Sequence, residues 1–170
     1  MLKLIGIGLM IAATTMVGLN MSASLSKRVS ELEASLVLLE KMQTYLRYEQ
    51  TPTDELIEKL ATLELFGSLR FLTECRRDMG KGTPFPQAWR AGVNRAKGAM
   101  HLSDKDLEAV RGISQIIGMS DAQGQISALD VTQDMLRDSL QEARQKKDTY
   151  GRLYRSLGVL SGVGIGIFLL

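Results

Sequence analysis

The sequence contains very little cysteine, histidine or aromatic side chain, and these absences exclude several kinds of site. It has one Cys and one His among 170 residues, and aromatic residues make up 5% of the chain. A single thiol closes no intrachain disulfide, and one thiol with one imidazole cannot supply the ligands of a zinc knuckle or a multi-histidine metal centre. The sequence therefore predicts no disulfide framework, no metal site and no cofactor.

A surplus of positive charge is also absent. The chain has 21 Lys and Arg against 19 Asp and Glu, which leaves a formal net charge of +2. All acidic residues and all basic residues except Lys3 lie between Ser26 and Ser156, so that the middle of the chain is nearly balanced. Sequence-independent binding of nucleic acid needs excess basic side chains to neutralise phosphates. We therefore predict no nucleic-acid partner.

Charged residues are missing from both ends of the chain. Leu4–Leu25 has 22 residues without a charge, and as a helix it would cover about 33 Å, enough for a hydrocarbon core of about 30 Å. Leu157–Leu170 has 14 residues and is short for a span, but Arg152 and Arg155 precede it and can snorkel. The predicted domains are a transmembrane helix over 1–25, a helical bundle over 26–156 and a short transmembrane helix over 157–170.

Basic residues flank both apolar runs on the side of the middle domain. Lys27 and Arg28 follow the first run, and Arg152 and Arg155 precede the second. The positive-inside rule then predicts a cytoplasmic middle domain with both termini outside. A competing interpretation is a secretory signal peptide cleaved at residues 22–24. The helical pattern continues through that point without a break, which favours the anchor.

Small residues recur four positions apart in both apolar runs, which places them on one helix face. They are Gly8 and Ala12 in the first run, and Gly158, Gly162 and Gly166 in the second. Such faces let another membrane helix approach closely. We predict packing there, within the chain or between subunits of a homo-oligomer. The alternative is that glycine is simply frequent in membrane helices.

Apolar residues in the middle of the chain are spaced three and four apart, and no segment alternates with period two. Their spacing from Leu25 through Leu39 continues out of the first apolar run and predicts one long helix from about Leu4 to Glu49. The predicted fold is therefore all-α, a bundle between two long terminal helices that continue into transmembrane anchors. The expected helix caps and stops are Thr51 ahead of Pro52, Gly80 in a left-handed conformation, Ser103 with Asp106, Gly118 at the end of a helix, and Ser120 with Gln123.

No group of residues has the composition of a catalytic site. The run Gly80–Thr83 lacks the residue order of a phosphate-binding loop. His101 is predicted to be a solvated loop residue, and Cys75 a core residue without a base to activate it. Carboxylates alternate with basic residues along the helices, as on a solvated face. The sequence therefore predicts a binding protein and no enzyme.

Several short motifs, collinear over the whole chain, resemble the stage III sporulation protein AB family of endospore-forming bacteria. They are Met1–Gly6 with Ala13–Thr15 and Gly18, Tyr48 with Thr51 and Pro52, Gly82–Trp89, Ile117 and Gly118 with Asp121, and Tyr154–Gly162. The sequence departs from the family at Gln43 and Tyr45, where acidic residues are frequent, and at Thr53, where leucine is usual.

The resemblance implies a scaffold in the channel between mother cell and forespore, similar to the F-type inner-membrane platform of type II secretion and type IV pilus machines. It implies a location in the mother-cell membrane facing the forespore, with the bundle in the mother-cell cytoplasm. The implied partners are other channel subunits and a secretion-type ATPase, with a candidate interface at Tyr48, Thr51, Pro52, Trp89 and Asp121. Two other interpretations remain open, a membrane-anchored sensor or adaptor and a secreted helical protein.

Overall fold

Every element of the structure is helical. The computed structural model describes the backbone of residues 2–49, 51–118 and 120–169, and the side chains of 12–49, 51–118 and 120–151 together with Leu153, Ser156 and Leu160. No strand occurs among these residues, which confirms the predicted all-α class. The α-helices are α1 Leu2–Thr44, α2 Thr53–Ala61, α3 Arg70–Met79, α4 Phe85–Ala96, α5 Asp104–Gly112 and α6 Ala122–Leu169. The short segments are a π-helix η1 Tyr45–Glu49 and the 3-10 helices η2 Glu64–Phe66, η3 Lys97–Ala99 and η4 Ile113–Gln115.

The chain divides into two compact units. One is Arg28–Gln141, called here the bundle unit, and the other consists of the terminal segments Met1–Lys27 and Glu142–Leu170, called the terminal unit. Both boundaries fall inside helices, since α1 and α6 each contribute to both units.

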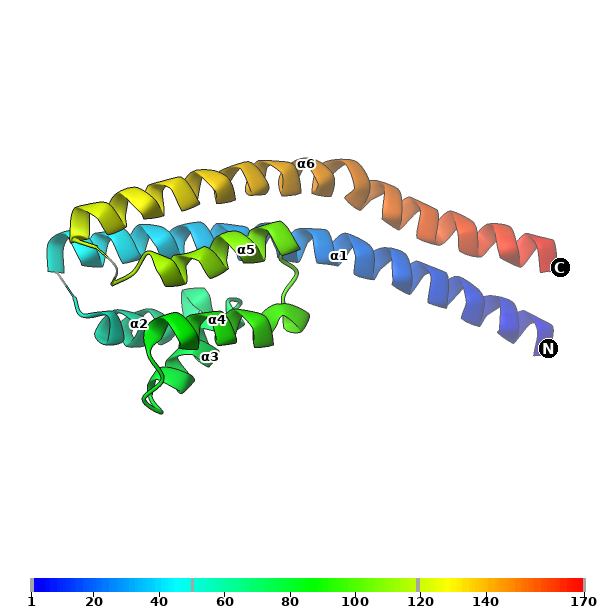
Figure 1. The fold of residues 1–170 in the computed structure, drawn as a ribbon. Coiled ribbons are helices and arrows are strands. Elements are labelled where there is room, and N and C mark those ends of the chain that lie inside the picture. The colour runs from blue at the N-terminus through cyan, green and yellow to red at the C-terminus, as the bar shows by residue number, and fades with distance from the viewer. Residues whose placement is uncertain (1, 50, 119, 170) are drawn as a thin grey trace. The chain divides into compact units, whose positions relative to one another are not determined.

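The bundle unit is built on a chain of helix contacts. Gln43 of α1 donates to the main-chain oxygen of Ile126 on α6 at 3.2 Å. The indole Nε1 of Trp89 on α4 donates to the carbonyl of Val110 on α5 at 2.8 Å. Trp89 also meets Phe71 of α3 edge to face, with ring centroids 5.1 Å apart. Figure 1 shows the outcome: α6 lies on one side of α1 and α5, and α2, α3 and α4 lie on the other.

Apolar side chains at helical spacing explain why these segments fold as they do. On α1 the predicted stripe at Val29, Leu32, Leu36 and Leu39 is buried. Apolar faces of the later helices are buried too, at Leu107, Val110, Ile113 and Ile117, and at Ile126, Leu129, Leu136, Leu140 and Ala143. Burial of one apolar stripe per helix accounts for a bundle of short helices between two long ones.

In the terminal unit the two ends of the chain run side by side (Figure 1). Gly18 of α1 and Gly151 of α6 are buried, and a Cβ atom at Gly151 would lie 3.5 Å from Ser22 Oγ. Ala12, one of the predicted packing residues, is exposed. The packing predicted at Gly8, Gly158, Gly162 and Gly166 lies outside the residues whose side chains the structure describes.

Over the described residues, the helices contain no stretch that combines the length and the apolar character needed for a membrane crossing. The anchors at 1–25 and 157–170 and the domain limits drawn from them therefore stay predictions.

Two of the predicted helix signals are confirmed. Ser103 Oγ accepts from the main-chain nitrogen of Asp106, and the Asp106 carboxylate accepts from that of Ser103, a reciprocal capping box at the start of α5. Gly118 has φ +81° and follows the last turn after η4.

Three others are wrong in whole or in part. Gly80 directly follows the last residue of α3, as predicted, but it is right-handed, and the left-handed residue is Gly82 with φ +86°. The Thr51 hydroxyl does not cap α2, because it donates to Glu49 Oε2 at 3.4 Å. Asp121 rather than Ser120 caps α6, since its Oδ1 accepts from the main-chain nitrogen of Gly124 at 2.9 Å.

Candidate interaction surfaces

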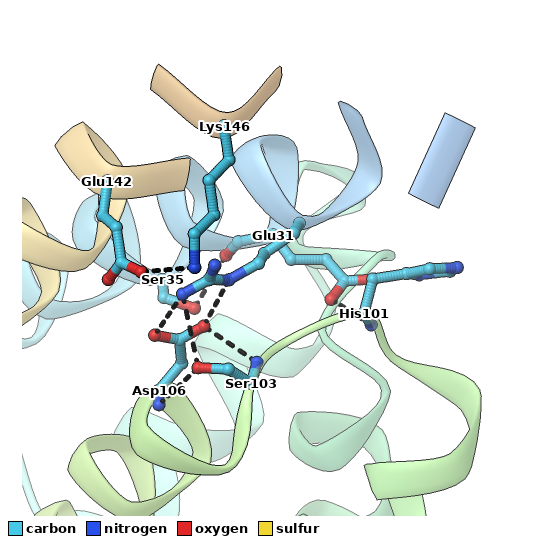
Figure 2. Close-up of polar contacts among 8 residues, drawn as sticks. Glu31, Ser35, His101, Ser103, Asp106, Glu142 and Lys146 are labelled. Carbon is cyan, nitrogen blue, oxygen red and sulfur yellow. Dashed lines mark hydrogen bonds and ion pairs between the residues drawn. The ribbon is translucent and has the colours of Figure 1, made fainter. Parts of the chain in front are cut away.

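A buried polar cluster joins α1 to the start of α5. Arg28 on α1 donates through Nε and Nη2 to the two oxygens of Asp106, at 2.8 and 3.2 Å. The Asp106 side chain is 0% exposed and that of Arg28 12%. Ser103 contacts both residues, as the Oγ acceptor of Arg28 Nη2 at 3.3 Å and through the capping box. Asp106 thereby serves two structural purposes, as an ion-pair partner and as a helix cap (Figure 2).

One turn along α1, Glu31 forms the second half of this cluster. Its Oε2 accepts from the main-chain nitrogen of His101 at 2.7 Å, and its Oε1 lies 3.0 Å from the His101 Nδ1 (Figure 2). Glu31 is 5% exposed. The prediction that His101 is a solvated loop residue is therefore only half right, because the residue lies in a loop but its ring pairs with a buried carboxylate. The assignment of the carboxylates to a solvated face is wrong for Glu31 and Asp106.

The electrostatics of Asp106 follow from this geometry. Burial alone would raise the pKa of this carboxyl group, but its hydrogen bonds to Arg28 and Ser103 outweigh burial and hold the pKa below the ordinary value of 3.8. Asp106 is therefore ionised near neutral pH. The cluster consists of charge-assisted contacts that link α1 to the start of α5.

The corner between α1 and α2 presents most of the predicted interface residues. Tyr48 is 76% exposed, Pro52 and Asp121 are exposed, and Thr51 is buried. The loop before α6 lies against this corner, since a Cβ atom on Gly118 would come within 3.8 Å of Thr53 Oγ1. The structure thus brings Tyr48, Pro52 and Asp121 to the same end of the bundle unit. We call these three residues the docking corner.

A shallow hollow adjoins the docking corner. It has a volume of about 210 Å³ and is lined by Glu40, Gln43, Thr44, Arg47 and Tyr48. Gln125, which the sequence did not mark, holds the loop before α6: its Oε1 accepts from Gly118 N and its Nε2 donates to Ser120 O, at 3.1 and 2.7 Å. No local sequence signal marks this glutamine, because its partners are loop main-chain atoms.

Trp89 lies apart from the docking corner. Its side chain is 0% exposed and packs between Phe71 and Phe85, with ring centroids 5.1 and 5.4 Å away. With its Nε1 bonded to Val110, the indole is a core residue and leaves no surface for a partner.

A second hollow, the α5–α6 groove, has a volume of about 400 Å³ and a largely apolar wall. Ala109, Gly112 and Ile116 line it from the α5 side, and Thr132 and Met135 from α6. Met135 and its neighbour Val131 are 47% and 62% exposed. Contiguous exposed apolar side chains of this kind are a common feature of interaction sites.

Charge is unevenly distributed over the bundle unit. Residues 70–99, which include α3 and α4, have seven basic and two acidic residues, a net charge of +5. The basic residues are Arg70, Arg76, Arg77, Lys81, Arg90, Arg95 and Lys97. Residues 121–141 have four acidic residues and one basic residue, a net charge of −3. These two segments lie on opposite sides of α1 and α5 (Figure 1).

The structure offers little to a reaction mechanism. Burial, followed by the nearby charge of Asp78, raises the pKa of Cys75 to about 12, so that the thiol is protonated and unreactive. Within the described residues, no three His, Cys, Asp or Glu side chains are grouped as metal ligands would be. The docking corner and the α5–α6 groove are the candidate surfaces for a partner.

Comparison with known proteins places this chain among sporulation proteins. The sequence profile of the stage III sporulation protein AB family matches residues 3–170. Stage III sporulation protein AB of Bacillus subtilis (strain 168) is 22% identical over 165 residues, which are 96% of each chain. A solved structure of a stage III sporulation protein AB (SpoIIIAB) is similar with a TM-score of 0.63 and 15% identity, over 72% of this chain and 98% of the other. This structural similarity shows a shared fold.

Proposed function

Because this chain belongs to the stage III sporulation protein AB family, we propose that it is a non-catalytic scaffold subunit of the channel complex between mother cell and forespore. The observation that carries the proposal is the profile match over residues 3–170, which includes both terminal segments as well as the bundle unit. The protonated thiol of Cys75 and the buried ion pair of Asp106 with Arg28 agree with a structural role.

The scaffold is anchored in the mother-cell membrane by residues 1–25 and 157–170, with the bundle unit in the mother-cell cytoplasm. Exposed apolar side chains on the terminal unit support this arrangement, because in water they would be costly to leave uncovered. They are Met16, Val17, Leu19, Met21, Leu153 and Leu160, each at least 46% exposed. The terminal unit also pairs the two ends of the chain, as an anchor of two helices requires.

The docking corner is the contact for a secretion-type ATPase, while the anchors meet other channel subunits. Tyr48 supports this assignment, because a tyrosine exposed to 76% offers a large aromatic contact at small entropic cost. The hollow lined by Arg47 and Glu40 next to it supplies polar partners.

Membrane topology is tested with a cysteine at Gly98 in the full-length chain. A Cβ atom there meets nothing within 4 Å, so that Gly98→Cys fits without strain. We expect a membrane-impermeant maleimide to label it only after cells are permeabilised, whereas a cysteine appended after Leu170 is labelled in intact cells. The native Cys75 is buried and stays unlabelled. Labelling of Gly98→Cys in intact cells would refute the cytoplasmic placement.

The ATPase contact is tested by Tyr48→Ala in sporulating cells. We expect recovery of the secretion-type ATPase with the tagged scaffold to fall about tenfold, the effect of losing one aromatic anchor. Tyr150→Ala is the matched control, since Tyr150 is also exposed, at 44%, but belongs to the terminal unit. Equal recovery with both variants would remove Tyr48 from the interface.

A further inference from the structure

We propose that the chain self-associates head to tail, with Leu63 and Leu65 of one copy seated in the α5–α6 groove of the next. The three residues Leu63, Glu64 and Leu65 precede α3 and are called here the leucine knob. This contact is separate from the docking corner and does not depend on the ATPase.

The leucine knob presents two partly exposed apolar side chains at the surface of the bundle unit. Leu63 is 37% exposed and Leu65 56% exposed, on either side of the exposed Glu64. The first charged side chain after the knob is Arg70 at the start of α3, which is exposed and forms no ion pair within the described part of the chain. The knob is therefore an apolar centre with one basic residue on its flank.

The α5–α6 groove has the complementary form. Its volume of about 400 Å³ is ample for two leucine side chains, since about 150 Å³ already accepts a benzene-sized group. On the adjoining face of α6, Asp134 and Asp138 are exposed. Asp134 pairs with Arg137 at 2.8 Å, and Asp138 has no ion pair among the described residues. The groove is therefore an apolar centre with an acidic flank.

The unpaired charges of the two surfaces are complementary as well. Lys105 and Glu108 both line the groove, but Glu108 pairs with Arg111, whereas Lys105 forms no ion pair in the described residues. Glu64, between the two leucines, forms none there either. Seating the leucine knob in the groove thus pairs Glu64 with Lys105 and Arg70 with the aspartates of α6. In this one orientation of the two copies, each charge faces a charge of opposite sign. The charges therefore fix how the copies are aligned as well as attracting them.

The occupant is a second copy because one chain cannot make the contact with itself. The leucine knob lies between α2 and α3, on the opposite side of α1 and α5 from α6 (Figure 1). Two different patches that fit each other form a heterologous contact, which leads to a ring if the rotation closes and to a filament if it does not.

Cysteine cross-linking between two differently tagged full-length chains tests this geometry. Leu65→Cys and Met135→Cys lie at exposed positions, so that neither should disturb the fold, which circular dichroism checks. Cys75 stays in place, since its pKa of about 12 keeps it unreactive. We expect a cross-linked dimer when the two variants are mixed, and about tenfold less when either is oxidised alone.

Two results would overturn the proposal. Strong cross-linking of Met135→Cys with itself would indicate a symmetric α6-to-α6 contact. Mixed variants that cross-link no better than the single variants would show that the groove is not filled by a second copy.

A charge exchange provides the second test. Lys105→Glu should weaken association of the purified chain about tenfold in sedimentation measurements, and the double variant Lys105→Glu with Glu64→Lys should restore it. Arg47→Glu is the matched control, because Arg47 is equally basic and exposed but borders the docking corner. Failure of the second substitution to rescue the first would refute the pairing of Glu64 with Lys105.

Discussion

Two helix contacts of the bundle unit are built in opposite ways. Between α1 and α5 the buried groups are charged, with Asp106 fully enclosed and held by Arg28. Between α3 and α4 the buried groups are apolar, with Phe71 edge to face with Trp89. The charges of that second contact lie near the surface, where Arg95 bonds Glu74 at 2.8 Å and both side chains keep some exposure.

The difference separates specificity from stability. A buried ion pair yields little net stability but is costly to break, because the remaining charge is left without its partner. Apolar packing yields stability in proportion to the area removed from water. We infer that the charged contact fixes the alignment of the long helix α1 with α5, while the α3–α4 packing supplies much of the core. Four changes test this division.

The largest effect is expected from Asp106→Ala. It removes both the partner of Arg28 and the cap of α5, so the free energy of unfolding should fall by about 3 kcal/mol. The control is Asp104→Ala on the same helix, whose side chain is 83% exposed and pairs with Lys97 at the surface. Chemical denaturation measures both variants. Equal losses would show that the buried pair is no more important than a surface one.

The second largest effect is expected from Gly92→Ala, which disturbs the apolar contact between α3 and α4. A Cβ atom there would lie 2.7 Å from the Phe71 main-chain oxygen and 3.1 Å from Cys75 N, so that Gly92→Ala must push α3 away from α4. We expect a loss of about 2 kcal/mol, the usual cost of overpacking. Gly98→Ala has free space around its new methyl group and should leave thermal stability unchanged. A tolerated Gly92→Ala would mean that the two helices can separate easily.

Much of the fold could be predicted because its signals are local. The stripe from Val29 to Leu39 predicted the long first helix. The Ser103 and Asp106 capping box could be predicted from a spacing of three, because both partners lie in one helical turn. Near the end of α3 the signal was ambiguous, since Gly80 and Gly82 are both candidates for the left-handed stop. The chain takes one more turn, in which Thr83 N donates to Asp78 O, before Gly82 adopts positive φ.

The buried polar cluster could not be predicted because its partners are far apart in sequence. Glu31 and His101 are 70 positions apart, and Arg28 and Asp106 are 78 apart. Taken singly, each looks like a surface charge or a loop residue, and only the packing of α1 on α5 pairs them. The docking corner was predicted through a family resemblance rather than through spacing. For Trp89 the same resemblance marked a residue whose burial makes it part of the core.

A smaller effect is expected from pH. The pKa of Asp106 is lower in the folded protein than its ordinary value of 3.8, so that as pH falls the unfolded state takes up the proton first. The stabilisation is therefore complete above about pH 5 and is lost as pH falls through the folded pKa. Denaturation curves between pH 7 and pH 3 should show this decline in the free energy of unfolding. Asp106→Asn should abolish the part of the decline that comes from Asp106. A decline of the same size in Asp106→Asn would assign it to other carboxylates.

The smallest effect is expected from Arg76→Ala, which removes an exposed ion pair between α3 and α2. Arg76 Nε bonds Glu58 Oε2 at 2.7 Å, but the two side chains are 43% and 55% exposed. Water and salt screen such a pair, so the free energy of unfolding should change by about 0.5 kcal/mol or less, and raising the salt concentration should erase even that. Glu58→Gln should behave alike if the pair is the cause. A loss in Arg76→Ala that approaches the loss in Asp106→Ala would contradict the division between buried and surface charge, because exposure would then no longer determine how much a charged contact contributes.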